Sequence, residues 1–238
     1  MKKNFFKEFA MVLAAALALS SFAACENGKE TKLLFMGHSS FRVTAKNGTV
    51  IYIDPYAEGA KDGYSPPADI ILITHEHSDH CKTDLVTQKK NCVIITNHEA
   101  IADGKHKTFK TKGIKIEAVE ANNRNHNPRI SAGYIITVDG IKLYHAGDTS
   151  RTRQMESFPE KKLDYAMLPV DGTYNMSAEA AAECAGLIKA KHNIPMHTGL
   201  FRGSHALPSE IFNRDVAERF AAPGRIILEP GDEIILTQ

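Results

Sequence analysis

The 238-residue sequence is poor in cysteine and has almost no excess charge of either sign. Its four cysteines, Cys25, Cys81, Cys92 and Cys184, lack the close spacing of a disulfide framework or a zinc knuckle, and we expect Cys92 and Cys184 to pack in the core. There are 29 Lys and Arg against 28 Asp and Glu, and no basic run predicts a nucleic-acid partner. No repeat of short fixed period is present. The length beyond the N-terminal leader suits one α/β domain and is too short for two.

The chain also lacks an apolar run long enough to span a bilayer as a helix. Its longest run, residues 9–19, follows three lysines and ends in small residues, which is typical of an export signal. Residues 22–25 resemble a bacterial lipoprotein box, in which cleavage leaves Cys25 as the lipidated N-terminus. An ordinary secretory signal cleaved near Ala24 is the alternative.

These patterns predict a signal peptide over residues 1–24, a tether over 25–30 and a single domain over 31–238. The expected location is the bacterial cell envelope, on a membrane reached through the lipid of Cys25 alone. Cleavage near Ala24 would instead give a soluble secreted protein. The sequence predicts neither the face of the membrane nor an oligomeric state.

Short apolar segments alternate with turn signals along the predicted domain, and two of them are followed by strong hairpin signals, Asn47-Gly48 and Asp139-Gly140. Ser177 is a predicted helix N-cap. The order of elements favours an α/β fold of two mixed sheets packed face to face with helices outside. The predicted strands cover residues 31–35, 41–45, 49–54, 69–74, 92–96, 114–119, 134–138, 141–144, 163–170, 194–197, 226–228 and 233–236, and the predicted helices cover 82–90, 99–103, 177–191 and 212–220.

A dense group of metal-binding residue types follows the predicted buried strand 69–74. His75, His77, Asp79 and His80 lie within six residues, in a loop where alternating side chains can converge on one point. Imidazole nitrogens and a carboxylate at this density suit zinc or a similar divalent ion, and one segment with four such groups can serve two adjacent ions. Hydrogen-bonded histidines in a polar loop are the structural alternative.

The run His-Glu-His-Ser-Asp-His resembles the His-x-His-x-Asp-His signature of metallo-β-lactamase-fold hydrolases. Other segments before and after this run resemble parts of that family in the same order, and the resemblance extends over residues 31–236. It is closest to the bacterial branch that includes ascorbate-phosphate lactonase and many metal-dependent hydrolases. The resemblance implies a four-layer αββα fold. The segments that carry it are residues 37–41, 51–55, 144–149, 168–176 and 195–197.

Carried over by position, the resemblance assigns His75 and His77 to a first metal ion, and Asp79, His80 and His197 to a second, with Asp148 bridging the two. The remaining histidine of the first site would come from the polar loop 122–129. His126 is the candidate there, with Asn122 or Asn123 as alternatives, so that occupancy by one ion or by two stays open. The metal would be Zn²⁺, with Mn²⁺ or Fe²⁺ as alternatives.

Three further residues are expected around the metal ligands rather than on the metal. Asp54 ends an apolar strand, where a carboxylate needs a partner, so we expect it to hydrogen-bond the metal-binding loop. His38 and His145 match positions beside the site in the resemblance, with purely structural roles as the alternative.

The resemblance implies a metal-dependent hydrolase acting on a small molecule with an ester, lactone or phosphoester bond, and the leader pattern implies that it is exported. A metal-bound hydroxide would attack, and Asp79 would orient it or take its proton. A β-lactam substrate is an alternative. So is a non-catalytic metal- or ligand-binding protein of the envelope on the same scaffold.

Overall fold

The computed structural model describes residues 30–56, 63–199 and 211–238 of the chain. The predicted signal peptide over residues 1–24, the lipidation site Cys25 and the tether up to residue 29 lie outside the described residues. Within the described ranges, every helix is too short or too polar to cross a membrane.

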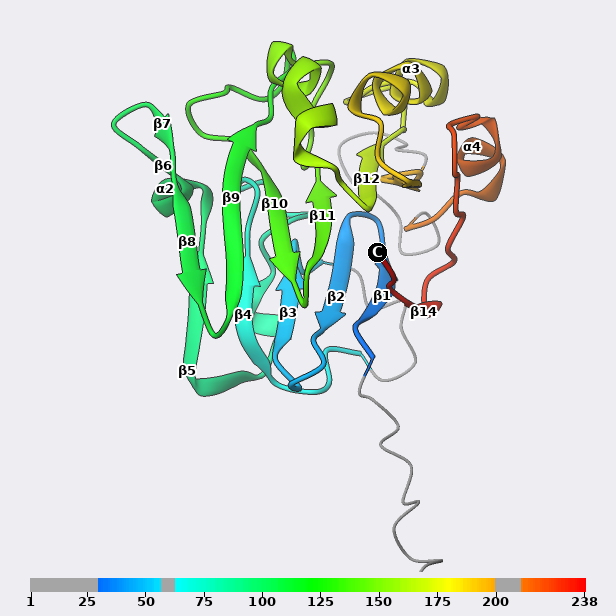
Figure 1. Cartoon of the computed structure of the whole chain (residues 1–238). Helices are drawn as coiled ribbons and strands as arrows, with labels where there is room; N and C mark the ends of the chain where they lie inside the picture. Colours follow the sequence, from blue (N-terminus) through cyan, green and yellow to red (C-terminus); the bar gives the residue numbers. More distant parts are fainter. Residues whose placement is uncertain (1–29, 57–62, 200–210) are drawn as a thin grey trace, which may run out of the picture.

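Two six-stranded sheets pack face to face (Figure 1). The first sheet has the order β14-β1-β2-β3-β4-β5 and is formed by β1 (Lys32–Gly37), β2 (Ser40–Thr44), β3 (Val50–Ile53), β4 (Ala68–Leu72), β5 (Gln88–Ile95) and β14 (Glu233–Ile235). The second has the order β13-β12-β11-β10-β9-β8 and is formed by β8 (Thr108–Thr111), β9 (Ile114–Glu120), β10 (Ala132–Val138), β11 (Ile141–His145), β12 (Tyr165–Pro169) and β13 (His192–Met196). A small ribbon pairs β6 (Ile101–Ala102) with β7 (Lys105–His106). The predicted pair of mixed sheets is confirmed.

Short helices lie outside both sheets. They are α2 (Asn97–Ala100), α3 (Ala178–Ile188), α4 (Arg214–Arg219) and the 3-10 helices η1 (Thr83–Leu85) and η2 (Arg153–Lys161). Helix α3 packs on η2 and β12, and it begins at the predicted cap, because the Ser177 side chain accepts a hydrogen bond from Ala180 N. Cys184 of α3 is buried in the core as predicted.

The central strands are buried on both faces, which explains their nearly uninterrupted apolar sequences. In β1, Leu33 and Phe35 join the core between the sheets, whereas Leu34 and Met36 join a second cluster on the outer face of the first sheet. That outer cluster is closed by Tyr64 and by residues around η1. Cys92 is only half-buried and packs at its margin, so its predicted place in the main core is wrong.

Both predicted hairpins form. Asp139 and Gly140 have φ values of +50° and +84° and join β10 to β11 in a two-residue turn, the geometry that favours Asp-Gly. The turn between β2 and β3 is one residue longer than a two-residue hairpin. Ala45 N donates to Thr49 O, so the loop encloses Lys46 together with Asn47 and Gly48.

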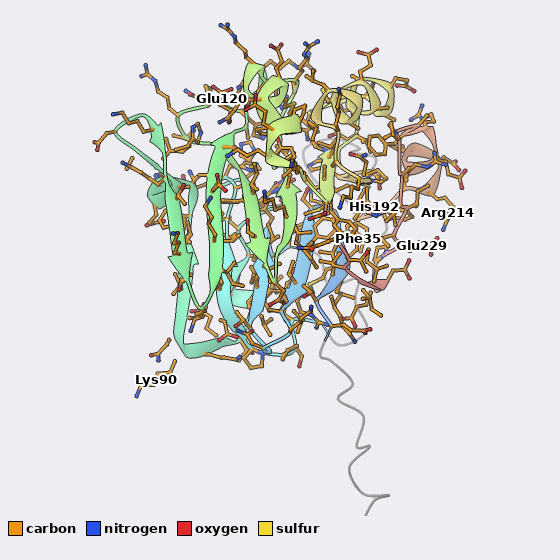
Figure 2. The ribbon with its side chains drawn as sticks, viewed as in Figure 1. Phe35, Lys90, Glu120, His192, Arg214 and Glu229 are labelled. Atoms are coloured by element: carbon orange, nitrogen blue, oxygen red, sulfur yellow. The ribbon has the colours of Figure 1, made fainter. Side chains whose placement is uncertain are left out.

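The helix predicted over residues 82–90 is wrong. The chain makes only the single turn η1 and then enters β5, an edge strand that pairs with β4 in parallel. Lys89 Nζ lies 2.6 Å from Asp69 Oδ2, and Lys90 projects into solvent (Figure 2). Charged side chains suit an edge strand, whose outer backbone groups are open to pairing with another chain. In the sequence, the charged residues of 82–90 resembled the exposed face of a helix, which is why a helix was predicted.

Smaller differences concern segments with weak patterns. Residues 226–228 form no strand. Ile226 N donates to Asn193 O, beside an isolated bridge between Asn193 and Arg225. The helical turn predicted over residues 99–103 begins earlier, as α2, and gives way to β6. β8 and η2 had no predicted counterpart.

The topology brings the carboxyl ends of parallel strands from both sheets to one edge of the sandwich. β3, β4 and β5 run parallel in the first sheet, and β11, β12 and β13 run parallel in the second. The sheets are joined at this edge, because Ala132 N donates to Thr74 O and His197 N donates to His38 O. Loops that leave the strands here are therefore held close together.

We expect Gly147→Ala to destabilise the protein more than Gly104→Ala. Both glycines have positive φ, +62° and +68°, so each alanine should cost about 1 kcal/mol in backbone strain. A Cβ at Gly147 would also lie 2.9 Å from Ala132 O and 3.0 Å from Thr74 Cβ, whereas one at Gly104 would have no atom within 4 Å. That crowding should add roughly 1–3 kcal/mol. Urea unfolding of both variants tests this; equal losses would contradict it.

Candidate metal centre

The loop after β4 begins on a buried hydrogen-bond network centred on Asp54. Asp54 follows β3 and has no exposed surface. Its Oδ1 accepts from Thr74 N at 2.8 Å, and its Oδ2 accepts from Thr74 Oγ1 at 2.6 Å and lies 2.8 Å from His80 Nδ1. The predicted contact between Asp54 and the histidine loop is therefore present, and it joins the start of the loop to its last histidine.

The same network fixes which nitrogen of each ring points inward. Because Thr74 Oγ1 gives its only hydrogen to Asp54, it accepts from His75 Nδ1, 3.0 Å away. His80 Nδ1 likewise donates to Asp54. When either ring is neutral, its lone pair is therefore on Nε2, the state in which imidazole binds a metal ion.

One group of three histidines meets on the side of the polar loop 122–129. His77 Nδ1 lies 3.1 Å from His75 Nε2 and 3.1 Å from His126 Nε2. His126 is buried, and its Nδ1 lies 2.8 Å from Asn123 Oδ1. Of the three candidates in this loop, His126 directs its ring into the group, and Asn123 contacts that ring from behind. We call His75, His77 and His126 the first group.

A second group surrounds Asp79. His38, Asp79, His80 and His197 each place a nitrogen or oxygen within 4.8 Å of the others. His38 Nε2 is 3.1 Å from Asp79 Oδ2, and the Nε2 atoms of His80 and His197 are each 3.8 Å from that oxygen. The structure thus brings His38 into the cluster itself, closer than its predicted place beside it. These four residues are the second group.

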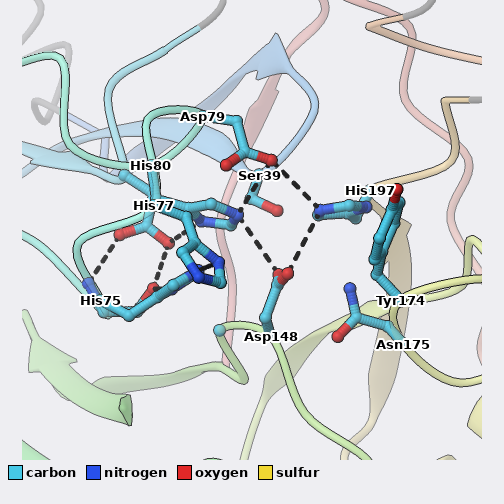
Figure 3. Close-up of polar contacts among 12 residues, drawn as sticks. Ser39, His75, His77, Asp79, His80, Asp148, Tyr174, Asn175 and His197 are labelled. Atoms are coloured by element: carbon cyan, nitrogen blue, oxygen red, sulfur yellow. Dashed lines mark hydrogen bonds and ion pairs between the residues drawn. The ribbon is translucent and has the colours of Figure 1, made fainter. Parts of the chain in front are cut away.

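Asp148 lies between the two groups (Figure 3). Its Oδ1 is 3.3 Å from His80 Nε2, and its Oδ2 is 3.3 Å from His197 Nε2 and 3.4 Å from His126 Nε2. This one carboxylate therefore faces nitrogens of both groups, as a bridging ligand would.

The side chains fit a divalent cation. His80 Nε2 and Asp148 Oδ1 are buried and face each other, yet neither has a hydrogen-bond partner within the described residues. Buried polar atoms are normally satisfied, so this pair indicates a site for something that accepts electron pairs. Nitrogen and carboxylate donors suit zinc and similar ions.

Burial and charge divide the histidines by protonation. Burial, reinforced by nearby histidines, lowers the pKa of His75 to about 3 and that of His38 to about 4. Burial also acts against the charged form of His80, but Asp148 and Asp54 outweigh it and raise its pKa to about 9. His75 and His38 are therefore neutral at pH 7, whereas a cation approaching His80 competes with a proton.

His145 and Asp171 stand behind the cluster. His145 Nε2 lies 2.9 Å from Ser39 O and so ties β11 to the turn that carries His38. Asp171, which follows β12, has Oδ2 3.2 Å from His197 Nδ1. Residues 168–176 carry part of the family resemblance, but Asp171 had no predicted role. The available signal was its place directly after a buried strand, like Asp54 and His75.

The chain is similar to proteins of known family. A model of the beta-lactamase superfamily domain matches residues 32–197. The UPF0173 metal-dependent hydrolase of Pyrococcus furiosus is 30% identical over 230 residues, which cover 86% of this chain and 99% of that protein. A UPF0173 metal-dependent hydrolase of Nitratidesulfovibrio vulgaris is 32% identical over 200 residues, 72% of this chain and 82% of that one.

Among solved structures, the metallo hydrolase Igni18 from the hyperthermophilic archaeon Ignicoccus hospitalis superposes with a TM-score of 0.66. It is 26% identical, and the match covers 87% of this chain and 99% of that one. The similarity thus extends over nearly the whole described fold.

We expect Asp54→Asn to weaken metal binding by roughly 10- to 100-fold, because the amide replaces one acceptor oxygen by an NH₂ group and so cannot accept from Thr74 N, Thr74 Oγ1 and His80 Nδ1 at once. Asp69→Asn is the control. Asp69 is another buried carboxylate, at the opposite end of β4, where it accepts from Val50 N and Lys89 Nζ. The Asp69→Asn substitution should lower the melting temperature and leave metal affinity unchanged. Competition with a chromophoric chelator measures affinity, and equal losses in both variants would refute a specific role for Asp54.

Proposed function

The chain belongs to the beta-lactamase superfamily and to its UPF0173 metal-dependent hydrolases, and from this premise we propose that it hydrolyses an ester, lactone or phosphoester bond in a small molecule of the cell envelope. The observation that carries the proposal is the position of Asp148, whose carboxylate lies within 3.4 Å of nitrogens from both histidine groups. That arrangement suits two neighbouring divalent ions.

We assign His75, His77 and His126 to one ion and Asp79, His80 and His197 to the other, with Asp148 shared. Zn²⁺ is the proposed metal, given the number of imidazole donors. A bound divalent cation acts as a Lewis acid that polarises a carbonyl or phosphoryl oxygen and lowers the pKa of water to about 7. No serine or cysteine nucleophile is then required.

Asp79 is the proposed proton acceptor. Its side chain is 25% exposed, in contrast to the enclosed Asp148, so Asp79 is the carboxylate of the cluster that a substrate and water can reach. His38 Nε2, 3.1 Å from Asp79 Oδ2, holds the carboxylate in place. A carboxylate fixed in this way can orient an attacking water and accept its proton.

The balance of 29 basic and 28 acidic residues favours a small molecule over nucleic acid as substrate. The leader pattern of residues 1–24 and Cys25 supports export with a lipid anchor, which would place substrates among envelope lipids or scavenged compounds.

Hydrolysis by the purified protein should require the metal. We expect two equivalents of zinc per chain, and turnover of at least one member of a panel of lactones, phosphodiesters and β-lactams that a chelator abolishes and added Zn²⁺ restores. Turnover of β-lactams alone would reassign the substrate. Stoichiometric metal without chelator-sensitive hydrolysis of any panel member would favour a non-catalytic binding protein.

Asp79→Asn should lower kcat by about 10²- to 10⁴-fold at saturating metal, because the amide cannot take a proton. Its melting temperature should stay close to that of the wild type. Glu76→Gln is the matched control: it lies in the same loop, its side chain is 66% exposed, and its contact is an exposed pair with His98. Loss of activity in step with a loss of thermal stability would mean that Asp79 is structural only.

A further inference from the structure

Asn123 and Asn175 connect the two histidine groups on the side away from Asp148. Asn123 Oδ1 lies 2.8 Å from His126 Nδ1, and its amide nitrogen donates to Asn175 Oδ1 at 3.0 Å. Asn175 in turn donates through Nδ2 to Asp171 Oδ2 at 2.8 Å. The same Asp171 oxygen lies 3.2 Å from His197 Nδ1. Figure 3 shows Asn175 beside His197, at the base of Tyr174.

The direction of every hydrogen bond in this path follows from Asp171. A carboxylate only accepts when it is ionised, and Asp171 Oδ1 accepts from two backbone N–H groups, those of Thr173 at 2.7 Å and Tyr174 at 2.6 Å. Asn175 must therefore present its NH₂ to Asp171 and its oxygen to Asn123. Asn123 then presents its own oxygen to His126, which donates from Nδ1.

One carboxylate thereby sets the tautomer of a histidine in each group. His197 Nδ1 faces Asp171 Oδ2 directly at 3.2 Å, and His126 donates to the same network through two amides. In both rings Nδ1 carries the hydrogen and Nε2 points toward Asp148 Oδ2, at 3.3 Å and 3.4 Å. Partners of this kind behind metal-binding histidines raise metal affinity.

We propose that Asn123 and Asn175 form a positioning bridge that orients His126 and His197 together, so that the two cation sites bind as a coupled pair. The inference rests on the metal assignment of the proposed function. An ion that fixes the ring of His126 also fixes Asn123, Asn175 and Asp171, and so orders His197 for the second ion. By linkage the effect is reciprocal.

Asn175→Ala removes the middle of the bridge and leaves the contacts of Asn123 with His126 and of Asp171 with His197 in place. Asn125→Ala is the matched control. Asn125 Nδ2 also joins the same two loops, by donating to Tyr174 O at 3.1 Å, but it lies outside the path between the histidines. Asn175→Asp keeps the side-chain volume and the acceptor for Asn123 yet cannot donate to Asp171.

The test is the pair of stepwise Zn²⁺ affinities of the full chain, measured by competition with a chromophoric chelator, together with the melting temperature of the metal-free protein. We expect Asn175→Ala and Asn175→Asp to weaken both binding steps by about tenfold or more. Asn125→Ala should change each step less than twofold. Metal-free melting temperatures near the wild-type value would show that the variants fold. If Asn175→Ala does not fold, the Zn²⁺ affinities of Asn175→Asp test the bridge.

Weakening of a single step, no change, an equal loss in Asn125→Ala, or a wild type that binds only one ion would each overturn the bridge. Hydrolysis is not part of this measurement. A chain that binds two ions as a coupled pair but cleaves no member of the substrate panel would refute the hydrolase proposal and leave the bridge standing.

Discussion

The buried carboxylate of Asp54 is the constraint on which the site depends. A charge without exposed surface is costly unless hydrogen bonds and opposite charges compensate it. Asp54 meets that requirement by accepting from the backbone and hydroxyl of Thr74 and from His80, so the end of β3 is joined to both ends of the histidine loop. The loop therefore has one favourable conformation, in which His75 and His80 direct Nε2 inward.

The rest of the cluster follows the same rule. Four of the buried imidazoles that turn Nε2 inward contact a fixed oxygen through Nδ1: Thr74 for His75, Asp54 for His80, Asn123 for His126 and Asp171 for His197. These contacts come from different loops, and the parallel strands bring the loops together at one edge. Lone pairs concentrated in this way repel one another unless protons or cations lie between them. This accounts for the raised pKa of His80 beside Asp148 and for a centre that suits metal ions.

Local sequence patterns predicted much of the fold because they report local physics. Strands buried on both faces carry continuous apolar runs, and Asp139-Gly140 accepts the positive φ of a tight turn. Local patterns gave the wrong secondary structure at residues 82–90 and 226–228, because the conformation of these segments depends on contacts with distant parts of the chain. Lys89 belongs to a strand because β5 pairs with β4 and the Lys89 side chain pairs with Asp69. The sequence of residues 82–90 contains no local signal for pairing with β4.

The sequence by itself determined that the histidine loop is a candidate metal-binding segment. His75, His77, Asp79 and His80 are neighbours along the chain, and their spacing already implies that their side chains converge on one point. The family resemblance added His126, Asp148 and His197 to the candidate metal ligands, and the structure brings these residues to the same point. Only the tertiary structure placed His38 inside the cluster and joined Asn123, Asn175 and Asp171 behind it. His38, Asn123 and the loop that carries Asp171 and Asn175 are far apart in sequence, and they meet through the packing of two sheets and the pairing of parallel strands, which no local pattern encodes.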